Sequence, residues 1–193
     1  MAKTGDDAVL VRHGQTEWSL DGRHTGSTDI PLTEEGRREA ETAGRRLAGR
    51  KFALVLSSPL ARALETCRLA GFGDAVQVRE DLREWDYGDY EGLTSPQIRE
   101  ERPDWYLFRD ACPNGETAEQ VGERVDRVIM EVRGVGGDAA LFGHGHCLRV
   151  LAARWLGFAA EDAGRLALST ATVGVLGYEH ERPALWLWNE TPS

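Results

Sequence analysis

The amino-acid sequence predicts an α/β fold of three layers, α/β/α, with a mostly parallel central sheet and a C-terminal antiparallel hairpin. Short apolar runs alternate with longer segments of helical periodicity, which is the order that parallel βα units require. The last two apolar segments are instead joined by a short turn, which favours a hairpin. The chain has 193 residues and neither an internal repeat nor a low-complexity linker, so we expect a single domain, 1–193.

Four short apolar runs are expected to form the strands of the parallel part of the sheet. They lie at residues 8–11, 52–57, 76–78 and 139–143, and their sequences are AVLV, FALVLS, VQV and AALFG. The hairpin is expected from TATVGVLGYEH at 170–180 and ALWLWNE at 184–190, with ERP at 181–183 as the connecting turn. Its outer edge is free, which would permit a homodimer.

Capping residues mark the expected starts of three helices. Thr33 is the expected N-cap of a helix that begins with two glutamates, which suit the positive end of a helix dipole. Ser58 is followed by Pro59, which predicts an N-cap with proline at the first helical position. Thr117 and Gln120 have the spacing of a capping box. These starts agree with the alternation of strands and helices on which the fold class depends.

Composition limits the partners and the location that we expect. The formal net charge is −9 and the isoelectric point is near 5.1, which argues against nucleic acid because its binding proteins usually present a basic surface. No apolar stretch reaches membrane-spanning length, and MAKTGDDAVL at 1–10 holds no signal-peptide core. We therefore expect a cytoplasmic protein without a membrane partner. Cys67, Cys112 and Cys147 lack the paired spacing of zinc sites or disulfide scaffolds, so reduced thiols are expected.

Cationic and imidazole side chains follow three of the expected strands. Arg12 and His13 come directly after the first run, Arg62 lies shortly after the second, and His144 and His146 follow the fourth. In open parallel sheets, ligands bind beyond the carboxyl ends of the strands. We therefore expect these side chains to face one crevice.

These residue types suit phosphoryl transfer. Arginine binds phosphate oxygens through two parallel hydrogen bonds, and neutral imidazole can attack phosphorus to give a phosphohistidine. Neighbouring arginines disfavour a positive charge on that imidazole. The leaving alkoxide needs a proton, and Glu84 is the candidate donor among acidic and aromatic neighbours. Spacing alone does not choose it over the other carboxylates of this run, which are Glu80, Asp81, Asp86 and Asp89.

Four segments, in this order, resemble the histidine phosphatase superfamily, which includes cofactor-dependent phosphoglycerate mutase and many acid phosphatases. They are VRHGQTEWSLDGRHTGSTDIPLTEEGRREA at 11–40, SSPLARALET at 57–66, LREWDYGDYEG at 82–92 and FGHGHCLR at 142–149. The resemblance covers nearly the whole chain and implies the three-layer fold without a metal or other cofactor. It implies His13 as the phosphate acceptor, Glu84 as the proton donor, and Arg12, Arg62 and His144 as the rest of the phosphate pocket.

The resemblance also implies a set of substrate contacts. Ser19 and the HTG segment, which is His24, Thr25 and Gly26, would contact the substrate. Trp85 lies in the acid-bearing loop, where an aromatic ring could line the mouth of the site.

Three further residues have competing interpretations. Tyr87 lies in the same loop as Trp85 and is a second candidate for the mouth. His146 is expected to bind substrate, although HGH also resembles the paired histidines of metal sites. Arg149 lies one helical turn beyond and would anchor a second phosphate together with His24, or else be a surface cation.

Within the superfamily, the chain is similar to phosphatases of the sedoheptulose bisphosphatase-like and broad acid phosphatase branch. The segments that carry this similarity are REWDYGDYEGLT at 83–94, RDACPNGET at 109–117 and HGHCLR at 144–149. We therefore expect a histidine acid-type phosphatase that hydrolyses small phosphate esters, namely sugar phosphates or bisphosphates. A cofactor-dependent phosphoglycerate mutase-like isomerase and a non-catalytic sensor of a phosphate ligand are the alternatives.

Overall fold

A computed structural model of the protein describes residues 6–191. Its six strands form one sheet in the order β3-β2-β4-β1-β5-β6. The strands β1 (Ala8–Arg12), β2 (Leu54–Ser57), β3 (Val76–Val78) and β4 (Ala139–Gly143) are mutually parallel. The last two, β5 (Val173–Glu179) and β6 (Arg182–Glu190), form an antiparallel hairpin that pairs with β1. The predicted mostly parallel sheet with a C-terminal hairpin is confirmed.

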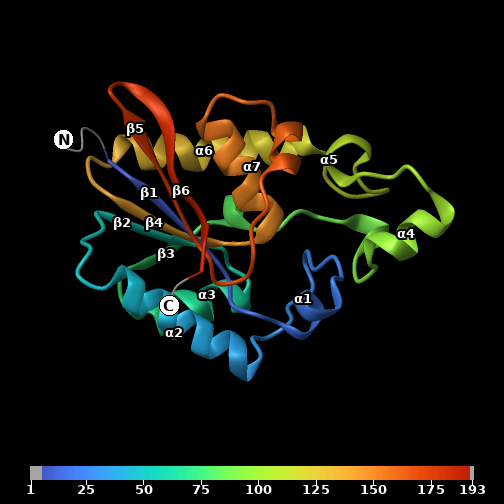
Figure 1. Cartoon of the computed structure of the whole chain (residues 1–193), viewed down its shortest axis with the longest axis horizontal. Helices are drawn as coiled ribbons and strands as arrows, with labels where there is room; N and C mark the ends of the chain where they lie inside the picture. The colour runs from blue at the N-terminus through green and yellow to red at the C-terminus, as the bar shows by residue number, and fades with distance from the viewer. Residues whose placement is uncertain (1–5, 192–193) are drawn as a thin grey trace.

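Helices cover both faces of the sheet (Figure 1), which confirms the three layers. On one face lie α2 (Glu34–Leu47), α3 (Ala61–Cys67) and the π-helical turn η1 (Arg68–Phe72). On the other lie α6 (Ala118–Gly134) and α7 (Gly145–Trp155). Shorter elements lie in the connections: α1 (Glu17–Asp21), α4 (Ser95–Glu101), α5 (Leu107–Asp110), and the 3₁₀ turns η2 (Glu80–Leu82), η3 (Gly88–Tyr90) and η4 (Ala160–Arg165).

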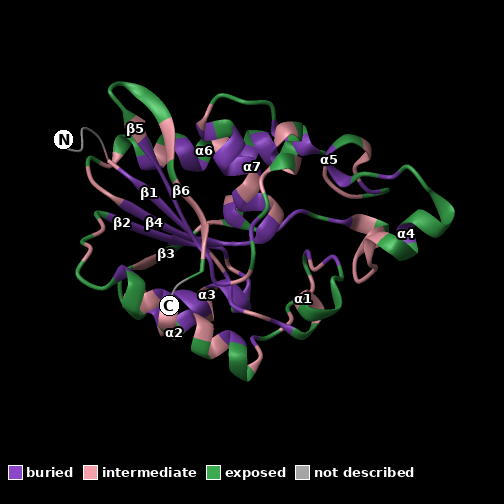
Figure 2. Ribbon diagram, viewed as in Figure 1, coloured by how far each residue is buried: buried purple, intermediate pink, exposed green. Residues whose placement is uncertain are grey.

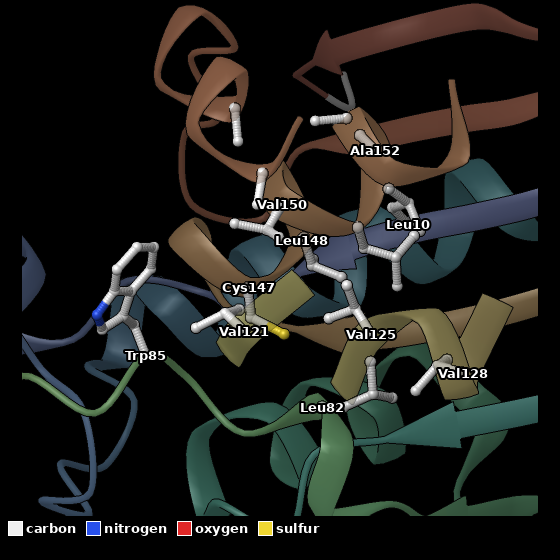
Figure 3. Close-up of a cluster of buried hydrophobic side chains, with 14 of the residues drawn as sticks. Leu10, Leu82, Trp85, Val121, Val125, Val128, Cys147, Leu148, Val150 and Ala152 are labelled. Atoms are coloured by element: carbon white, nitrogen blue, oxygen red, sulfur yellow. The ribbon is translucent and has the colours of Figure 1, made fainter. Parts of the chain in front are cut away.

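The core follows from the alternation of side chains along the strands. Leu10 of β1 belongs to the apolar cluster under α6 and α7, whereas its neighbours Val9 and Val11 belong to the cluster under α2. Figure 2 shows β1, β2 and β4 as almost continuously buried, whereas the edge strands β3 and β6 are intermediate or exposed. In Figure 3, side chains from β1, η2, α6 and α7 meet in the first cluster, with Trp85 at its margin.

Most of the predicted helix starts are confirmed. Thr33 caps α2 by accepting from the backbone N–H of Gly36, and Thr117 and Gln120 form the capping box of α6. The prediction for Ser58 is wrong, because α3 begins at Ala61 and has no side-chain cap.

The turn of the hairpin is shorter than predicted. The register pairs Glu179 with Arg182 and Tyr178 with Pro183, so only His180 and Glu181 form the turn and Pro183 belongs to β6. Because β6 is the edge of the sheet, proline can be accommodated there despite its missing N–H.

Of the segment 1–10, in which we expect no signal peptide, residues 1–5 lie outside the described residues. Across residues 6–191, no helix is both long enough and apolar enough to cross a membrane.

Candidate active site

Adjacent strands bring three of the expected catalytic residues to one edge of the sheet. Arg12, at the end of β1, is paired with Gly143, at the end of β4. The next residue on each strand is a histidine, and the ring centroids of His13 and His144 lie 5.2 Å apart. Arg62, in the first turn of α3, donates from Nε to His144 Nδ1 over 3.2 Å. The fold therefore places His13, His144 and Arg62 in one cluster.

His13 is a neutral imidazole with one nitrogen available. Nδ1 lies 2.7 Å from the carbonyl oxygen of Gly14, and since a carbonyl only accepts, Nδ1 carries the proton and Nε2 keeps its lone pair. Burial lowers the pKa of His13 well below its usual value, and the charges of Arg12 and Arg62 lower it further. Nε2 is therefore free to act as a nucleophile at neutral pH.

His144 has the opposite tautomer. Its Nδ1 accepts from Arg62, so in the neutral ring Nε2 carries the proton and donates it to Ser58 Oγ at 2.7 Å. Burial lowers the pKa of His144 well below its usual value, and Arg62 and His13 lower it further. The ring can therefore lie beside His13 without adding another positive charge.

Arg62 holds the HTG segment in place. The side chain is fully buried, and besides the contact with His144 it donates to the carbonyl oxygens of Thr25, Gly26 and Thr28, each at 3.0 Å. These contacts use four of the five N–H groups of the guanidinium. Arg62 thus joins the loop after β1 to the histidine after β4.

Arg12 keeps a donor available. Its Nη1 donates to the carbonyl oxygen of Leu168, whereas its Nε is buried without a partner. Within residues 6–191, Arg12 Nε is the one buried side-chain nitrogen or oxygen in this condition. An unpaired buried donor costs about 1–3 kcal/mol, so the position favours an anionic ligand that would accept from it.

Glu84 reaches the site from the loop that follows η2. Its Oε1 accepts from the backbone N–H groups of Trp85 and Cys147, both at 2.9 Å, and its Oε2 accepts from that of His146 at 3.1 Å. Positions 146 and 147 lie in the first turn of α7, whose N-cap, His144, makes no side-chain cap. Glu84 therefore supplies the missing cap and is fixed next to the histidines.

A cavity of about 230 Å³ lies at this edge of the sheet. From the expected catalytic set, Arg12, His13 and Glu84 line it. The other four carboxylates of the acidic segment, which are Glu80, Asp81, Asp86 and Asp89, do not line this cavity. The cavity therefore selects Glu84 from a segment in which spacing alone could not do so. From the expected substrate-binding set, the wall includes Ser19, His24, Thr25, Tyr87, His146 and Arg149.

Tyr87, His146 and His24 give one part of the cavity a neutral polar surface. Tyr87 Oη lies 2.6 Å from His146 Nδ1, and burial raises the pKa of Tyr87 well above its usual value, so the phenol keeps its proton. The ring of His24 is stacked 6.2 Å from that of His146 and donates from Nδ1 to the carbonyl oxygen of Leu93. Burial lowers the pKa of both imidazoles, which are therefore uncharged at neutral pH.

Arg149 provides a cation farther along the cavity. Its Nε and Nη2 donate to the carbonyl oxygens of Ala163 and Gly164, and its guanidinium lies 4.7 Å from the ring centroid of Phe108. Neither hydrogen bond uses Nη1. Arg149 is therefore not a plain surface cation, because it is anchored in the wall with one end free.

Trp85 and Gly26 lie differently from the expectation of direct substrate contact. Trp85 is fully buried, donates from its indole to the carbonyl oxygen of Glu116, and is absent from the lining of the cavity. Gly26 donates its N–H to Glu91 at 2.9 Å, and a Cβ there would lie 2.6 Å from Oε2 of the same carboxylate. Both residues therefore contact other parts of the protein next to the site, Trp85 at Glu116 and Gly26 at Glu91.

Three residues that hold the site are not identified by sequence reasoning. Ser58 orients His144, Glu91 accepts from the N–H groups of Gly26 and Thr28, and Arg124 binds the loop that carries Glu84. Glu91 lies inside the motif LREWDYGDYEG, which was the signal available for it. Nothing in the local sequence separates Arg124 from the other arginines of its helix.

The described part of the chain offers no cluster of ligands for the alternative of a metal site. Within residues 6–191, no group of three or more His, Cys, Asp or Glu side chains is placed to hold a metal ion. The three cysteines are buried and free, and burial raises the pKa of Cys147 to about 12, so its thiol is not ionised.

The sequence matches one family description over almost its full length. The sequence model of the histidine phosphatase superfamily (branch 1) matches residues 8–191. Among solved structures, that of an open reading frame product from Mycobacterium tuberculosis superposes with a TM-score of 0.91 at 40% identity, covering 97% of this chain and 99% of that one.

Characterised relatives include phosphatases and mutases. An acid phosphatase from Mycobacterium tuberculosis is 43% identical over 176 residues, which are 89% of this chain and 86% of the relative. A sedoheptulose 1,7-bisphosphatase from Saccharomyces cerevisiae is 40% identical over 182 residues, which are 77% of this chain and 67% of the relative. A 2,3-bisphosphoglycerate-dependent phosphoglycerate mutase from Mesorhizobium japonicum is 36% identical over 181 residues, which are 84% of this chain and 87% of the relative.

Proposed function

Because this chain belongs to the histidine phosphatase superfamily, we propose that it is a phosphomonoesterase that works through a phosphohistidine on His13, with Glu84 as proton donor. One observation carries the proposal. His13 and Arg12 both line the cavity; Nε2 of His13 is unprotonated, and Nε of Arg12 is buried without a partner. An uncharged nucleophile and an unsatisfied cation at one cavity suit a phosphate dianion.

In the first step, the phosphoryl group moves from the ester to His13. Arg12 binds its oxygens at the cavity, Arg62 and His144 join it by exchanging their present hydrogen-bond partners for phosphoryl oxygens, and Nε2 attacks phosphorus in line with the leaving oxygen. The N–P bond forms as the O–P bond to the alcohol breaks. Glu84 gives its proton to the leaving oxygen, so a neutral alcohol departs and Glu84 becomes a carboxylate.

In the second step, water removes the phosphoryl group. The Glu84 carboxylate takes a proton from a water molecule as the oxygen of that water attacks phosphorus. The N–P bond breaks, His13 returns to the neutral imidazole, and inorganic phosphate leaves. Glu84 is protonated again, which restores the starting state.

Small sugar phosphates and bisphosphates are the proposed substrates. Supporting observations are the volume of about 230 Å³, the neutral polar wall of Tyr87, His24 and His146, and the free end of Arg149. Imidazoles and a phenol suit sugar hydroxyl groups, and the guanidinium suits a second phosphate. Of the relatives, one is named as a sedoheptulose 1,7-bisphosphatase, which acts on a sugar bisphosphate, and another as an acid phosphatase.

A phosphoglycerate mutase-like isomerase is the second candidate, favoured by the mutase relatives. It would return the phosphoryl group to an alcohol, whereas a phosphatase transfers it to water. We favour hydrolysis because only a modest stretch of chain, from Glu84 to Asn114, is available to shield the phosphorylated histidine. A single domain, a cytoplasmic location and a homodimer stay predictions.

The test combines product analysis with trapping of the intermediate. Purified protein is incubated with p-nitrophenyl phosphate, sugar mono- and bisphosphates, or 3-phosphoglycerate with a bisphosphoglycerate primer. We expect inorganic phosphate as the main product, a phosphorylated peptide that contains His13 in acid-free digests, and neither with His13→Ala. Dominant isomerisation would favour the mutase, and binding of phosphate without turnover would favour the sensor.

A further inference from the structure

Arg124, in the second turn of α6, binds the main chain on both sides of Glu84. Its Nη1 donates to the carbonyl oxygens of Asp81 and Arg83, both at 2.8 Å, and its Nη2 donates to that of Glu84 at 3.2 Å. The rest of the guanidinium forms an ion pair with Glu116, with distances of 2.8 and 3.0 Å. All five N–H groups are thereby used, and the residue is only 8% exposed.

Glu116 continues this frame to the other side of the loop. Its Oε2 accepts from the N–H of Asp86, and its own N–H donates to the carbonyl oxygen of Asp86, both at 2.9 Å. Its carbonyl oxygen accepts from the indole of Trp85 at 2.9 Å. The Arg124–Glu116 pair therefore fixes the backbone from 81 to 86.

The packing of α6 rests mainly on its apolar face, although Arg124 Nη1 also lies 3.5 Å from Cys147 Sγ in the same cluster. The apolar face of α6, with Val121, Val125 and Val128, is buried in the cluster that Figure 3 shows. By contrast, the donors of Arg124 go to the loop around Glu84, whose carboxyl group is bound at its other end by the first turn of α7. Main chain and side chain of Glu84 are thus fixed by two different helices.

We propose that Arg124, with Glu116, is a positioning residue that aligns Glu84 for proton transfer to the leaving oxygen. This inference rests on the proposed function, in which Glu84 is the donor. General acid catalysis requires the donor within hydrogen-bond reach of the atom that it protonates, so a shift of the loop reduces that contribution first. Within residues 6–191, none of the side-chain hydrogen bonds of Arg12, Arg62 and His144 goes to the backbone of residues 81–86.

The leaving group separates this role from general support of the fold. An alkyl phosphate such as glycerol phosphate expels a strongly basic alkoxide and needs the proton, whereas p-nitrophenyl phosphate expels a stable phenolate and needs it little. The measured quantity is kcat/KM, which reports formation of the phosphoenzyme. General acid catalysis contributes roughly 100- to 10,000-fold, which sets the upper limit of the effect.

The main variant is Arg124→Lys, which keeps a cation near Glu116 but cannot reach three carbonyl groups and a carboxylate at once. We expect kcat/KM to fall roughly 10- to 100-fold for glycerol phosphate and only slightly for p-nitrophenyl phosphate. Arg127→Lys is the matched control. Arg127 lies on the exposed side of the same helix as Arg124, and it binds the side chain of Asp81 rather than the main chain of the loop. Arg127→Lys should leave kcat/KM unchanged for both esters. Thermal unfolding establishes that each variant is folded.

A double-mutant cycle with Glu84→Gln completes the test. If Arg124 acts through Glu84, Arg124→Lys costs nothing further for glycerol phosphate once the carboxyl group is gone. Equal losses on both esters, or additive losses in the double variant, would overturn the positioning role and leave the proposed function intact. Wild-type protein that hydrolyses neither ester would instead contradict the proposed function itself, and the positioning role with it.

Discussion

His144 donates its Nε2 proton to Ser58 Oγ over 2.7 Å, from the start of α7 to the end of β2. The same ring accepts from Arg62 on its other nitrogen, so both positions of the imidazole are assigned by their partners. The neutral ring is thereby held in one tautomer and one orientation beside His13.

Ser58→Ala should reduce both stability and activity. The buried Nε2 proton of His144 would lose its acceptor, which costs about 1–3 kcal/mol in the free energy of unfolding. The freed ring would also lower kcat/KM roughly 10-fold, as is typical when the partner of a functional histidine is removed. Urea denaturation and steady-state hydrolysis of p-nitrophenyl phosphate measure the two effects. Ser57→Ala is the control, because within residues 6–191 the Ser57 hydroxyl donates to the carbonyl oxygen of Ser58 and has no bond to His144. Unchanged kcat/KM in Ser58→Ala would contradict the role of Ser58.

Mild acid should destabilise the folded protein. Burial lowers the pKa values of His13, His24, His144 and His146, with nearby cations adding to the effect at three of them. Their stabilisation is complete above the unfolded pKa near 6.5 and is lost as the pH falls below it, because the unfolded chain then binds more protons. Each such histidine contributes up to about 1.4 kcal/mol per pH unit.

The measurement for this pH effect is the urea midpoint between pH 7.5 and 5.5. We expect it to decrease with falling pH and to decrease less steeply in His146→Gln. A midpoint that rises as the pH falls would show that these imidazoles do not dominate the titration.

Glu91→Gln should weaken substrate binding more than it slows the chemical step. The Glu91 carboxylate accepts from the backbone N–H groups of Gly26 and Thr28, the segment whose carbonyl groups bind Arg62. A loosened segment would leave Arg62 less well ordered, so we expect a higher KM and a smaller change in kcat. Glu101→Gln, an exposed change at the end of α4, is the control. A fall in kcat at constant KM would contradict this interpretation.

Arg149→Met should discriminate bisphosphates from monophosphates. If its free Nη1 binds a second phosphate, the loss of that charged hydrogen bond, about 1.5–3 kcal/mol, lowers kcat/KM for a sugar bisphosphate roughly 10- to 100-fold. A sugar monophosphate should be affected less. Arg154→Met, on the same helix but paired with Asp126, controls for the loss of a cation. Equal effects on the two substrates would argue against a second phosphate at this position.

Hydrolysis should not depend on a metal ion. In the proposed mechanism Arg12 and Arg62 supply the positive charge that offsets the phosphoryl group, and the acid is Glu84. We expect dialysis against a chelator to leave the rate of p-nitrophenyl phosphate hydrolysis unchanged. Loss of activity that is restored by a divalent cation would replace this mechanism with a metal-assisted one.

The sheet and the cluster at its edge could be predicted because their determinants are local. The four apolar runs correspond to β1 to β4, and the residue that follows β1 and β4 is a histidine in each case. Parallel strands put such residues at the same edge, and the pairing of β4 with β1, which the sequence does not predict, makes His13 and His144 neighbours.

The supporting residues could not be predicted because their partners are distant in the chain. Ser58 has the local pattern of an N-cap, but its hydroxyl accepts from a histidine 86 positions away. Arg124 and Arg127 lie one helical turn apart, and only the fold distinguishes the buried one from the exposed one. Likewise, Glu84 could be selected from the carboxylates of residues 80–89 only once the structure showed which of them lines the cavity.

The central position of β1 has a consequence for biosynthesis. It is translated before the other five described strands, yet its two neighbours, β4 and β5, begin only at residues 139 and 173. Until they emerge, a nascent chain carries an apolar segment with no strand on either edge, which is a state that chaperones recognise and that aggregates when unprotected. His13, the proposed nucleophile, is thus translated well before the two strands that flank β1, and its surroundings assemble only once those strands have been made.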